Sequence, residues 1–428
     1  MRYFLECTHT HKSQLRTGIQ RVVRNLVRHS RARGQVTPVI VQGDRFVALE
    51  GEDPLAPIPQ PAGARALILR AARGAYAGLR AFASALLPFP AARRFLNAPR
   101  HEFGLSFLIA RAAAACLPAA RQAMAQPEGV KPGPGDVLLL VDSSWHDHPW
   151  AAARAFKAHG GLIVCMIHDL IPETHPEYCD DRLRALFADW ITQAFELADG
   201  FVCNSQTTAD AVHARLIAAG KAQKATHFWL GSEIAGDTTL QESSPPLTAL
   251  DTEDPVFACV GTLEPRKNQT YALDAFDMAW AQGVRARLLL VGRLGWMSEP
   301  VVARIRHHER YGRDLFLLTD ADDTTLSRIY QRANALVFPS HVEGFGLPLV
   351  EALQQGAPVI ASDIPVFREI ARTGVDFVRL DDPADCACAV IAHCANGAPR
   401  LEHPIEWLSW AQSTDQFYGA VSDCLAKT

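Results

Sequence analysis

The sequence predicts an α/β protein built from two Rossmann-like, doubly wound domains. Three observations support this class. The chain has 428 residues, more than one hydrophobic core usually organises. Short apolar runs alternate with longer amphipathic segments, which is typical of parallel strands connected by helices. A stretch at 231–254, rich in Gly, Ser, Thr, Pro and acidic residues, divides these runs into two series.

Each series contains six short apolar runs bounded by turn-forming residues, which predict strands. The first series predicts strands at 2–6, 36–41, 137–141, 162–167, 200–203 and 227–230. The second series predicts strands at 256–260, 287–291, 315–318, 335–338, 358–361 and 377–379. The amphipathic segments between the runs are expected to form the helices that cover both faces of each sheet.

The two series define the expected domains. An N-terminal domain is expected at 1–230, a linker at 231–254 and a C-terminal domain at 255–402. A helical insertion rich in Ala, Leu and Arg, at 63–126, interrupts the first domain. The last segment, 403–428, has apolar residues near helical spacing and predicts a terminal helix that buries one face.

Charge is distributed unevenly along the chain. The net charge is -4, but residues 62–131 carry nine arginines and one lysine against two glutamates, a local charge of +8. This stretch suits peripheral contact with an anionic membrane or acidic glycan, and an ordinary solvated basic face is an equal alternative. The sequence starts directly with a strand-like run, and its apolar stretches are shorter than the roughly 20 residues that cross a bilayer. We therefore expect a cytoplasmic protein, with peripheral contact at the inner face of the membrane through 63–126.

Several function classes are disfavoured. The overall charge is acidic and the basic stretch lacks interleaved aromatic residues, which argues against nucleic-acid binding. No Gly-x-Gly-x-x-Gly follows the first strand, which argues against a dehydrogenase. Ten scattered cysteines indicate a reducing compartment, and Cys386, Cys388 and Cys394 near His393 lack the paired spacing of a zinc site. We expect neither a metal nor a cofactor.

The most specific motif is Phe-Pro-Ser-His-Val-Glu-Gly-Phe-Gly-Leu-Pro-Leu-Val-Glu-Ala at 338–352. A predicted strand ends at Phe338, two glycines free the turn, and Pro348 fits the first turn of a helix. The backbone N–H groups around Gly344 to Leu347 should then point at one spot, with the positive end of the helix dipole behind them. Such a spot suits phosphate.

Glu343 and Glu351 lie eight residues apart in this motif, which is at most about 12 Å of helical rise. One carboxylate could hold hydroxyls of a transferred sugar and the other a ribose, with a diphosphate between them. A solvent-exposed glutamate pair on a surface helix is the alternative.

A second motif, Val-Gly-Thr-Leu-Glu-Pro-Arg-Lys-Asn at 260–268, leaves the first strand of the second series. Its adjacent cations, Arg266 and Lys267, lie where ligands bind in open α/β sheets, beyond the carboxyl end of a strand. Arg grips phosphate oxygens in bidentate fashion and Lys adds a point charge, so the pair suits a leaving diphosphate. A salt-bridged surface pair is the alternative.

Together the two motifs resemble glycosyltransferase family 4, a family of retaining enzymes with the GT-B fold. The resemblance covers 255–428, including 337–340 and 356–362. It implies two Rossmann-like domains that face a cleft, with the N-terminal domain at 1–230 binding the acceptor and the C-terminal domain at 255–402 binding the nucleotide sugar. The terminal helix would cross back to the N-terminal domain. It also implies that a nucleotide diphosphate sugar is a substrate and that the acceptor is an oligosaccharide or a lipid-linked glycan.

The resemblance assigns roles position by position. Arg266 and Lys267 would bind the donor diphosphate, Glu351 the ribose and Glu343 the transferred sugar. The other expected donor-binding positions in this half are Gly261, Thr262, Gly344, Phe345, Gly346 and Leu347.

The N-terminal half resembles the family more loosely. Thr17 to Arg21 is similar to the family's glycine loop, with Gly18 alone in place of a glycine pair. Ile167 to Pro172 is similar to the segment whose histidine meets the transferred sugar, which assigns that role to His168. A histidine that simply caps a loop is the alternative.

The implied reaction is hexosyl transfer by front-face substitution with retention, in bacterial surface-polysaccharide synthesis and without a metal. The leaving phosphate itself would accept the proton of the acceptor hydroxyl. The resemblance to mannosyl, rhamnosyl and fucosyl transferases favours mannose from GDP-mannose, with rhamnosyl, fucosyl or glucosyl transfer as alternatives. A GT-B nucleotide-sugar epimerase and a non-catalytic scaffold are alternatives from other classes.

Overall fold

The computed structural model describes residues 1–13, 17–34, 36–51, 53–56, 128–233, 248–250, 252–371, 373–397 and 399–426. The insertion predicted at 63–126 and most of the predicted linker at 231–254 lie outside these residues. Residues 1–54 and 131–428 form one compact unit that contains both sheets, and residues 55–130 form a second unit.

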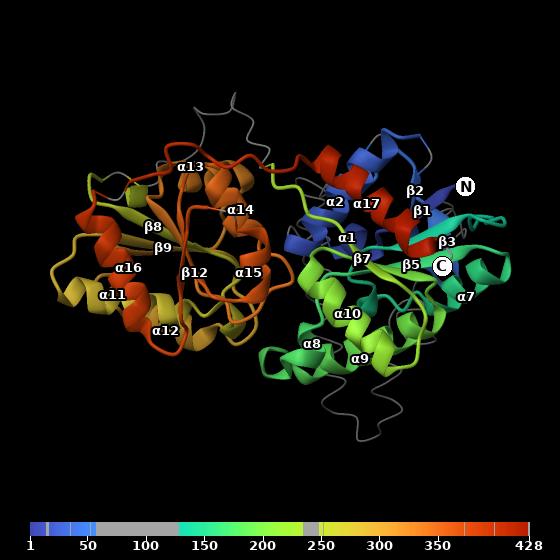
Figure 1. Cartoon of the computed structure of the whole chain (residues 1–428), viewed down its shortest axis with the longest axis horizontal. Helices are drawn as coiled ribbons and strands as arrows, with labels where there is room; N and C mark the ends of the chain where they lie inside the picture. Colours follow the sequence, from blue (N-terminus) through green and yellow to red (C-terminus); the bar gives the residue numbers. More distant parts are fainter. Residues whose placement is uncertain are drawn as a thin grey trace, which may run out of the picture. The chain divides into compact units, whose positions relative to one another are not determined.

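The first sheet has seven strands within the described residues, in the order β3-β2-β1-β4-β5-β6-β7 (Figure 1). Its strands are β1 (Tyr3–Glu6), β2 (Val36–Gln42), β3 (Arg45–Ala48), β4 (Val137–Leu140), β5 (Leu162–Ile167), β6 (Gly200–Cys203) and β7 (Ala225–His227). All neighbours are parallel except β2 and β3. The helices of this part are α1 (Thr8–Ser13), α2 (Gly18–Arg31), η1 (Ser144–His146), α7 (Trp150–Ala158), α8 (Ile171–Thr174), η2 (Pro176–Tyr178), α9 (Asp181–Leu197) and α10 (Gln206–Ala218).

The second sheet is parallel throughout and has six strands in the described part of the chain, in the order β10-β9-β8-β11-β12-β13. Its strands are β8 (Val256–Val260), β9 (Arg287–Val291), β10 (Leu315–Leu318), β11 (Ala335–Phe338), β12 (Val359–Ser362) and β13 (Val375–Val378). Its helices are η4 (Thr248–Leu250), η5 (Pro265–Lys267), α11 (Gln269–Ala281), α12 (Glu299–Arg306), α13 (Asp323–Arg332), α14 (Leu347–Gln354), α15 (Pro365–Ile370) and α16 (Pro383–Ala395), and α17 (Trp410–Leu425) ends the described chain. The predicted pair of Rossmann-like sheets is confirmed.

The central strands are apolar because helices cover both faces of each sheet. Every residue of β4 and β8 is buried, as expected for parallel strands without a solvent-facing side. Strand β5 has the same character, with five buried residues behind its intermediate first residue. These runs were recognisable in the sequence for that reason.

Two strand predictions need correction, and one strand was not predicted. The strand predicted at 227–230 is wrong in position, because β7 ends at His227 and the apolar Phe228 is buried edge-on against Phe417 of α17 instead. The last strand lies at Val375–Val378, two residues earlier than its predicted start at 377. Strand β3 was not predicted; it pairs antiparallel with β2 across a two-residue turn in which Gly43 has a φ of +66°.

Helix α17 packs on the first sheet, against α2, β6 and β7, as Figure 1 shows in red. Its Ala420 carbonyl accepts a hydrogen bond of 2.9 Å from the hydroxyl of Thr226 in β7. The helix begins at Trp410, with Ser409 as N-cap, rather than at the predicted 403. The predicted crossing of the terminal helix back to the first sheet is confirmed.

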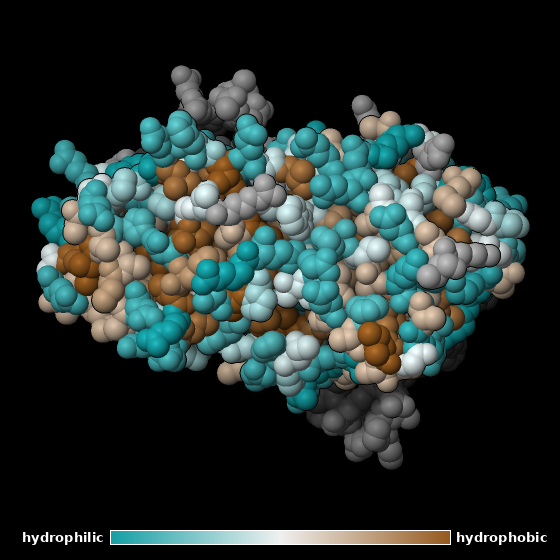
Figure 2. All heavy atoms as spheres, viewed as in Figure 1, coloured by the Kyte–Doolittle hydropathy of each residue, from teal (hydrophilic) through white to brown (hydrophobic). Residues whose placement is uncertain are grey.

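The surface exposes apolar side chains only in small groups. On the face drawn in Figure 2, small hydrophobic groups are interspersed among hydrophilic residues, which is common in folded proteins. Among the described helices, none is long and apolar enough to cross a membrane.

Each sheet has one point where the strand order reverses direction. In the first sheet the reversal lies between β1 and β4, and in the second it lies between β8 and β11. Ligands of open α/β sheets bind beyond the carboxyl ends of the strands at such switch points. The loops that follow β1, β4, β8 and β11 are therefore where binding sites are expected.

Candidate active site

The switch point of the second sheet brings the two sequence motifs together. The loop after β8 begins with Gly261, whose φ is +154°, and lies directly against the loop after β9. A Cβ on Gly292 would lie 1.9 Å from the carbonyl oxygen of Gly261, so only glycine permits this approach. Thr262 continues the loop, and its carbonyl accepts a hydrogen bond of 2.9 Å from the side chain of Gln269 in α11. The segment that carries the cations is thus held at the carboxyl edge of β8.

Both predicted cations contact the predicted sugar-binding glutamate. The Arg266 guanidinium donates to Glu343 at 2.8 Å and also to the carbonyl of Val342 at 2.9 Å. The Lys267 ammonium donates to the other Glu343 oxygen. A second carboxylate, Glu264, lies 2.7 Å from Arg266. Glu343 is therefore ion-paired with the two cations that were expected to bind a diphosphate.

This ion-pair cluster strongly favours the charged forms. Burial by itself would raise the pKa of Glu343, but Arg266 and Lys267 hold that pKa at about 2. Burial by itself would lower the pKa of Arg266, but Glu343 and Glu264 raise it above its ordinary value. The site thus keeps Arg266 ion-paired with charged carboxylates, and a phosphate would have to compete with these carboxylates for the cations.

The glycine turn opens helix α14 as the motif predicted. Gly346 is the N-cap of the helix with a φ of +114°, and Pro348 lies in its first turn. A Cβ on Gly346 would lie 2.7 Å from the ring of Phe367, so the turn is also sterically restricted to glycine. Glu343 precedes the helix, so it is presented by the turn rather than by helical spacing. The amino end of α14 supplies backbone N–H groups without intrahelical acceptors.

Glu351 lies inside α14 and is 1% exposed. It accepts a hydrogen bond of 2.5 Å from Arg21 of α2 and one of 3.0 Å from the Tyr330 hydroxyl of α13. Burial raises the pKa of Glu351, and the positive charge of Arg21 opposes that rise. Arg21 and Tyr330 are site residues that sequence reasoning did not assign. Arg21 is the last residue of the Thr17 to Arg21 segment. The resemblance of this segment to a family loop was the only sequence feature that pointed to Arg21.

His168 reaches the glycine turn through its backbone. A Cβ on Gly344 would lie 2.0 Å from the His168 carbonyl oxygen, and Ser205 of the α10 N-cap donates to the Gly344 carbonyl at 2.8 Å. The imidazole is buried and its Nε2 lies 2.9 Å from the carbonyl oxygen of Val141. Burial lowers the pKa of His168, so the ring is neutral at pH 7. The neighbouring Asp169 has a raised pKa because it is buried, although Arg266 opposes that rise.

The remaining predicted positions are distributed around this cluster. Phe345 and Leu347 are buried in the turn beside Gly346. Gly18 is the first residue of α2, three residues before Arg21, and a Cβ there would have no neighbour within 4 Å. The structure therefore gathers Arg266, Lys267 and Glu343 at one point, and Glu351 lies on the helix that follows Glu343. Gly18 is connected to Glu351 only because Arg21, in the same first turn of α2, bonds that glutamate.

Two doubly wound sheets, a cation pair at a switch point and a glycine turn that opens a helix define a protein of the GT-B class. Two family models match within the chain: Glycosyltransferase Family 4 over residues 136–223 and Glycosyl transferases group 1 over residues 241–391. Each of these two segments is therefore similar to a glycosyltransferase family, in agreement with the resemblance, and the two sheets have the arrangement of the GT-B fold. The second match contains Arg266, Lys267, Glu343 and Glu351; the first contains His168 but not Gly18.

Curated relatives include bacterial mannosyltransferases. The chain is 34% identical over 295 residues to a serotype-specific mannosyltransferase of Escherichia coli, covering 65% of this chain and 36% of that protein. It is 46% identical over 136 residues to an O-antigen chain mannosyltransferase of Salmonella typhimurium, covering 31% of this chain and 37% of that protein. The chain thus spans about a third of the length of these relatives.

Solved structures support the fold. The Anabaena HepE protein, in complex with UDP and glucose, has a TM-score of 0.56 and 15% identity, over 99% of this chain and 100% of that one. Sucrose-phosphate synthase from Thermosynechococcus elongatus has a TM-score of 0.55 and 19% identity, over 99% of this chain and 95% of that one. At these identities the likeness concerns the fold alone.

Proposed function

We propose that the protein transfers a mannosyl group from GDP-mannose to a growing glycan, with retention of anomeric configuration and without a metal ion. One observation carries the proposal: Arg266 and Lys267 converge on Glu343 at the switch point of the second sheet, beside the amino end of α14. The donor diphosphate would take the place of the Glu343 carboxylate on the two cations. Glu343 would then be released to the hydroxyls of the transferred sugar.

Electrostatics would supply most of the rate acceleration. As the bond between the anomeric carbon and the phosphate oxygen breaks, negative charge grows on the leaving diphosphate, and both cations bind it more strongly. The acceptor hydroxyl attacks from the same face, and its proton passes to the leaving phosphate oxygen. The new glycosidic bond forms on the side that the phosphate leaves, so configuration is retained without an enzyme nucleophile.

The cation pair also supports metal independence. Arg266 and Lys267 supply two positive charges where many nucleotide-sugar enzymes would need a divalent ion. Transfer that continues at full rate in excess chelator is the expected result, and loss of transfer that Mg²⁺ or Mn²⁺ restores would contradict this part of the proposal.

The choice of mannose rests on the relatives. Two bacterial mannosyltransferases are 34% and 46% identical over the matched parts, whereas the solved structure with bound UDP is only 15% identical. Rhamnosyl, fucosyl and glucosyl transfer stay as alternatives within the same chemistry. We also propose that the protein works at the inner face of the cytoplasmic membrane, because residues 62–131 carry a charge of +8.

Two alternatives come from other classes. A nucleotide-sugar epimerase would use the same diphosphate site but would convert the donor without any acceptor. A non-catalytic scaffold would have no use for two partly buried cations, a paired Glu343 and a buried Glu351. Formation of free nucleoside diphosphate only when a glycan acceptor is present would separate transfer from both alternatives.

The direct test is a thermal-shift screen with GDP-, UDP- and dTDP-sugars. A ligand that binds only the folded state stabilises it by about 2.7 kcal/mol at one hundred times its dissociation constant. We expect GDP-mannose to raise the melting temperature most. If none of these nucleotide sugars changes the melting temperature, the proposed function is wrong.

A further inference from the structure

Arg21 of α2 brings a cation from the first sheet to the carboxylate that is expected to bind the ribose. Arg21 and Tyr330 each donate to a different oxygen of Glu351. Tyr330 is fully buried and Glu351 is 1% exposed, whereas the Arg21 side chain is 20% exposed. Because Arg21 is the more exposed of the two donors, it covers Glu351 on the side that faces solvent.

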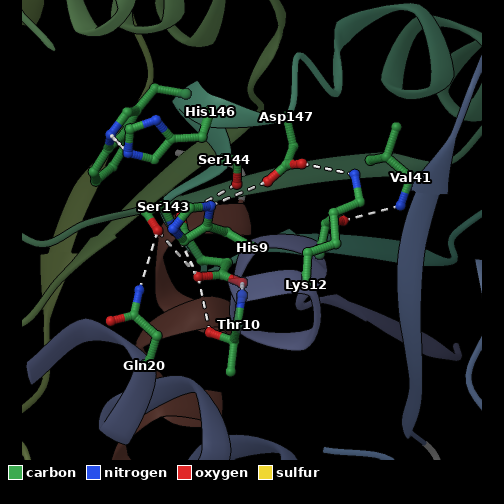
Figure 3. Close-up of polar contacts among 12 residues, drawn as sticks. His9, Thr10, Lys12, Gln20, Val41, Ser143, Ser144, His146 and Asp147 are labelled. Carbon is green, nitrogen blue, oxygen red and sulfur yellow. Dashed lines mark hydrogen bonds and ion pairs between the residues drawn. The ribbon is translucent and has the colours of Figure 1, made fainter. Parts of the chain in front are cut away.

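The first turn of α2 holds Arg21 in this position. The Arg21 backbone N–H donates to the Thr17 carbonyl at 2.9 Å, and the Asn25 side chain donates to the Arg21 carbonyl at 3.0 Å. The neighbouring Gln20 is buried, and its amide nitrogen lies 3.4 Å from the hydroxyl of Ser143 in the segment after β4 (Figure 3). Arg21 therefore projects from a backbone that is tied to the first sheet.

This position is unfavourable for helix α2 itself. The amino end of a helix carries a partial positive charge, which disfavours a cation in the first turn. The first turn of α2, which the structure describes completely, contains no acidic residue that would offset Arg21. A residue that breaks a local preference in this way is expected to serve a contact elsewhere, and the contact here is Glu351 of α14.

A guanidinium and a ribose present the same kind of donor pattern to a carboxylate. Arg offers N–H groups in a rigid fork, a ribose offers two neighbouring hydroxyls, and both patterns match the two carboxylate oxygens. Glu351 lies four residues after the first residue of α14, which is about 6 Å of helical rise. A nucleotide whose diphosphate lies at the amino end of α14 would bring its ribose to this carboxylate. Arg21 and the ribose would therefore compete for Glu351.

A second anion is available to Arg21 when it leaves Glu351. Burial by itself would lower the pKa of Arg21, but the charges of Glu351 and Asp323 raise it above its ordinary value. Asp323 is an exposed residue in the first turn of α13. The exchange would thus give Glu351 the ribose hydroxyls and leave Arg21 with Asp323 as its counter-ion.

We propose that Arg21 competes with the donor ribose for Glu351, so that a donor molecule must displace this arginine before its ribose is bound. The inference rests on the proposed function and adds to the donor site a residue of the first sheet that sets the affinity for the ribose. The cost of breaking the contact lowers the apparent affinity for the nucleotide. A nucleotide without ribose hydroxyls would leave Arg21 on Glu351 and would not bear this cost.

The test is isothermal titration calorimetry with GDP and with 2′,3′-dideoxy-GDP, which lacks both ribose hydroxyls. Arg21→Gln removes the competing cation, and we expect it to lower the Kd for GDP about five-fold or more, with the Kd for the dideoxy nucleotide within about two-fold of wild type. Burial raises the pKa of Glu351 and Arg21 opposes that rise. The titrations are therefore made at pH 8.5, which favours the ionised carboxylate in the variant.

Arg21→Lys keeps a charge but loses the planar fork, so its Kd for GDP should lie between those of the wild type and of Arg21→Gln. This second variant carries the test if Arg21→Gln does not fold. Arg28→Gln is the matched control, because Arg28 is an exposed residue of the same helix. It should leave the Kd for both nucleotides unchanged.

An unchanged or higher Kd for GDP in the Arg21 variants would overturn the inference, because Arg21 would then not oppose the ribose. An equal change for GDP and for the dideoxy nucleotide would also overturn it, since a purely structural role of Arg21 affects both ligands alike. A wild-type protein that binds neither nucleotide overturns the proposed function instead.

Discussion

The two switch points occupy the same position in two sheets that share the order of their central strands, but they present different side chains. Between β8 and β11, two cations converge on one carboxylate beside a glycine turn. Between β1 and β4, the stacked imidazoles of His9 and His146 and the ion-paired Asp147 lie beside the buried carboxylates of Glu6 and Asp142. Open α/β sheets bind ligands at such points, and the side chains present there decide which kind of ligand each point suits.

The two regions also shift the pKa values of their buried glutamates in opposite directions. In the second sheet, Arg266 and Lys267 keep the pKa of Glu343 at about 2, so its charge is permanent at neutral pH. In the first sheet, burial and the neighbouring Asp142 raise the pKa of Glu6 to about 7. A carboxylate beside cations can be exchanged for another anion, whereas a buried carboxyl group that accepts backbone N–H bonds serves the framework. The following substitutions test this contrast.

The largest effect is expected at Glu351, where helix α14 meets α2. Glu351→Ala leaves the guanidinium of Arg21 buried without its carboxylate, and breaking a buried ion pair in this way costs about 3–5 kcal/mol. Transfer should fall to the background rate, because the expected ribose ligand is also gone. Chemical denaturation and product formation from GDP-mannose measure the two effects.

Glu309→Ala is the control, since the Glu309 side chain is 81% exposed. It should match the wild type in both measurements. An unchanged denaturation midpoint in Glu351→Ala would show that the contact with Arg21 does not form in solution.

Lys267→Ala should have the next largest effect, on transfer rather than on stability. Removing one charge that stabilises a developing oxyanion typically lowers kcat about 100- to 1000-fold. We expect a fall of this order, with a smaller change in donor binding because Arg266 remains. Lys221→Ala, at an exposed position after α10, should keep wild-type kcat. Wild-type turnover in Lys267→Ala would remove the cation pair from the proposed mechanism.

The smallest effect is a pH dependence that comes from Glu6. Its folded-state pKa of about 7 lies above the ordinary 4.5, so the folded state binds more protons between these values. The contribution is fully present below about pH 4.5 and is lost as the pH rises through 7, by about 1–3 kcal/mol. Glu6→Gln should remove this part of the pH dependence.

Denaturation at pH 5 and pH 8 compares Glu6→Gln with the wild type. Glu196→Gln, at an exposed position of α9, is the control and should keep the wild-type pH dependence. Equal slopes for wild type and Glu6→Gln would mean that Glu6 is ionised throughout this range. Glu343 has the opposite sign, since its contribution is present above about pH 4.5 and is lost as the pH falls towards 2.

Much of the fold was predictable because its signals are local. Buried parallel strands are apolar on both faces, so β4, β5 and β8 appear as short apolar runs in the sequence. The glycine turn before α14 was predictable for the same reason. Gly346 permits the positive φ of the N-cap and Pro348 fits the first turn of a helix, and both preferences are local. The apolar run at 227–230 misled the strand prediction, because burial against α17 and burial in a sheet leave the same pattern.

By itself the sequence determined two parallel-sheet domains, the order of their strands along the chain and the two motifs that carry Arg266, Lys267 and Glu343. Only the tertiary structure decided that both cations are paired with Glu343, that Arg21 reaches Glu351, and that the segments after β1 and β4 form one polar cluster. The reason is physical: Arg21 and Glu351 are 330 residues apart, and the energy of an ion pair depends on distance and burial. Neither quantity exists until the chain has folded.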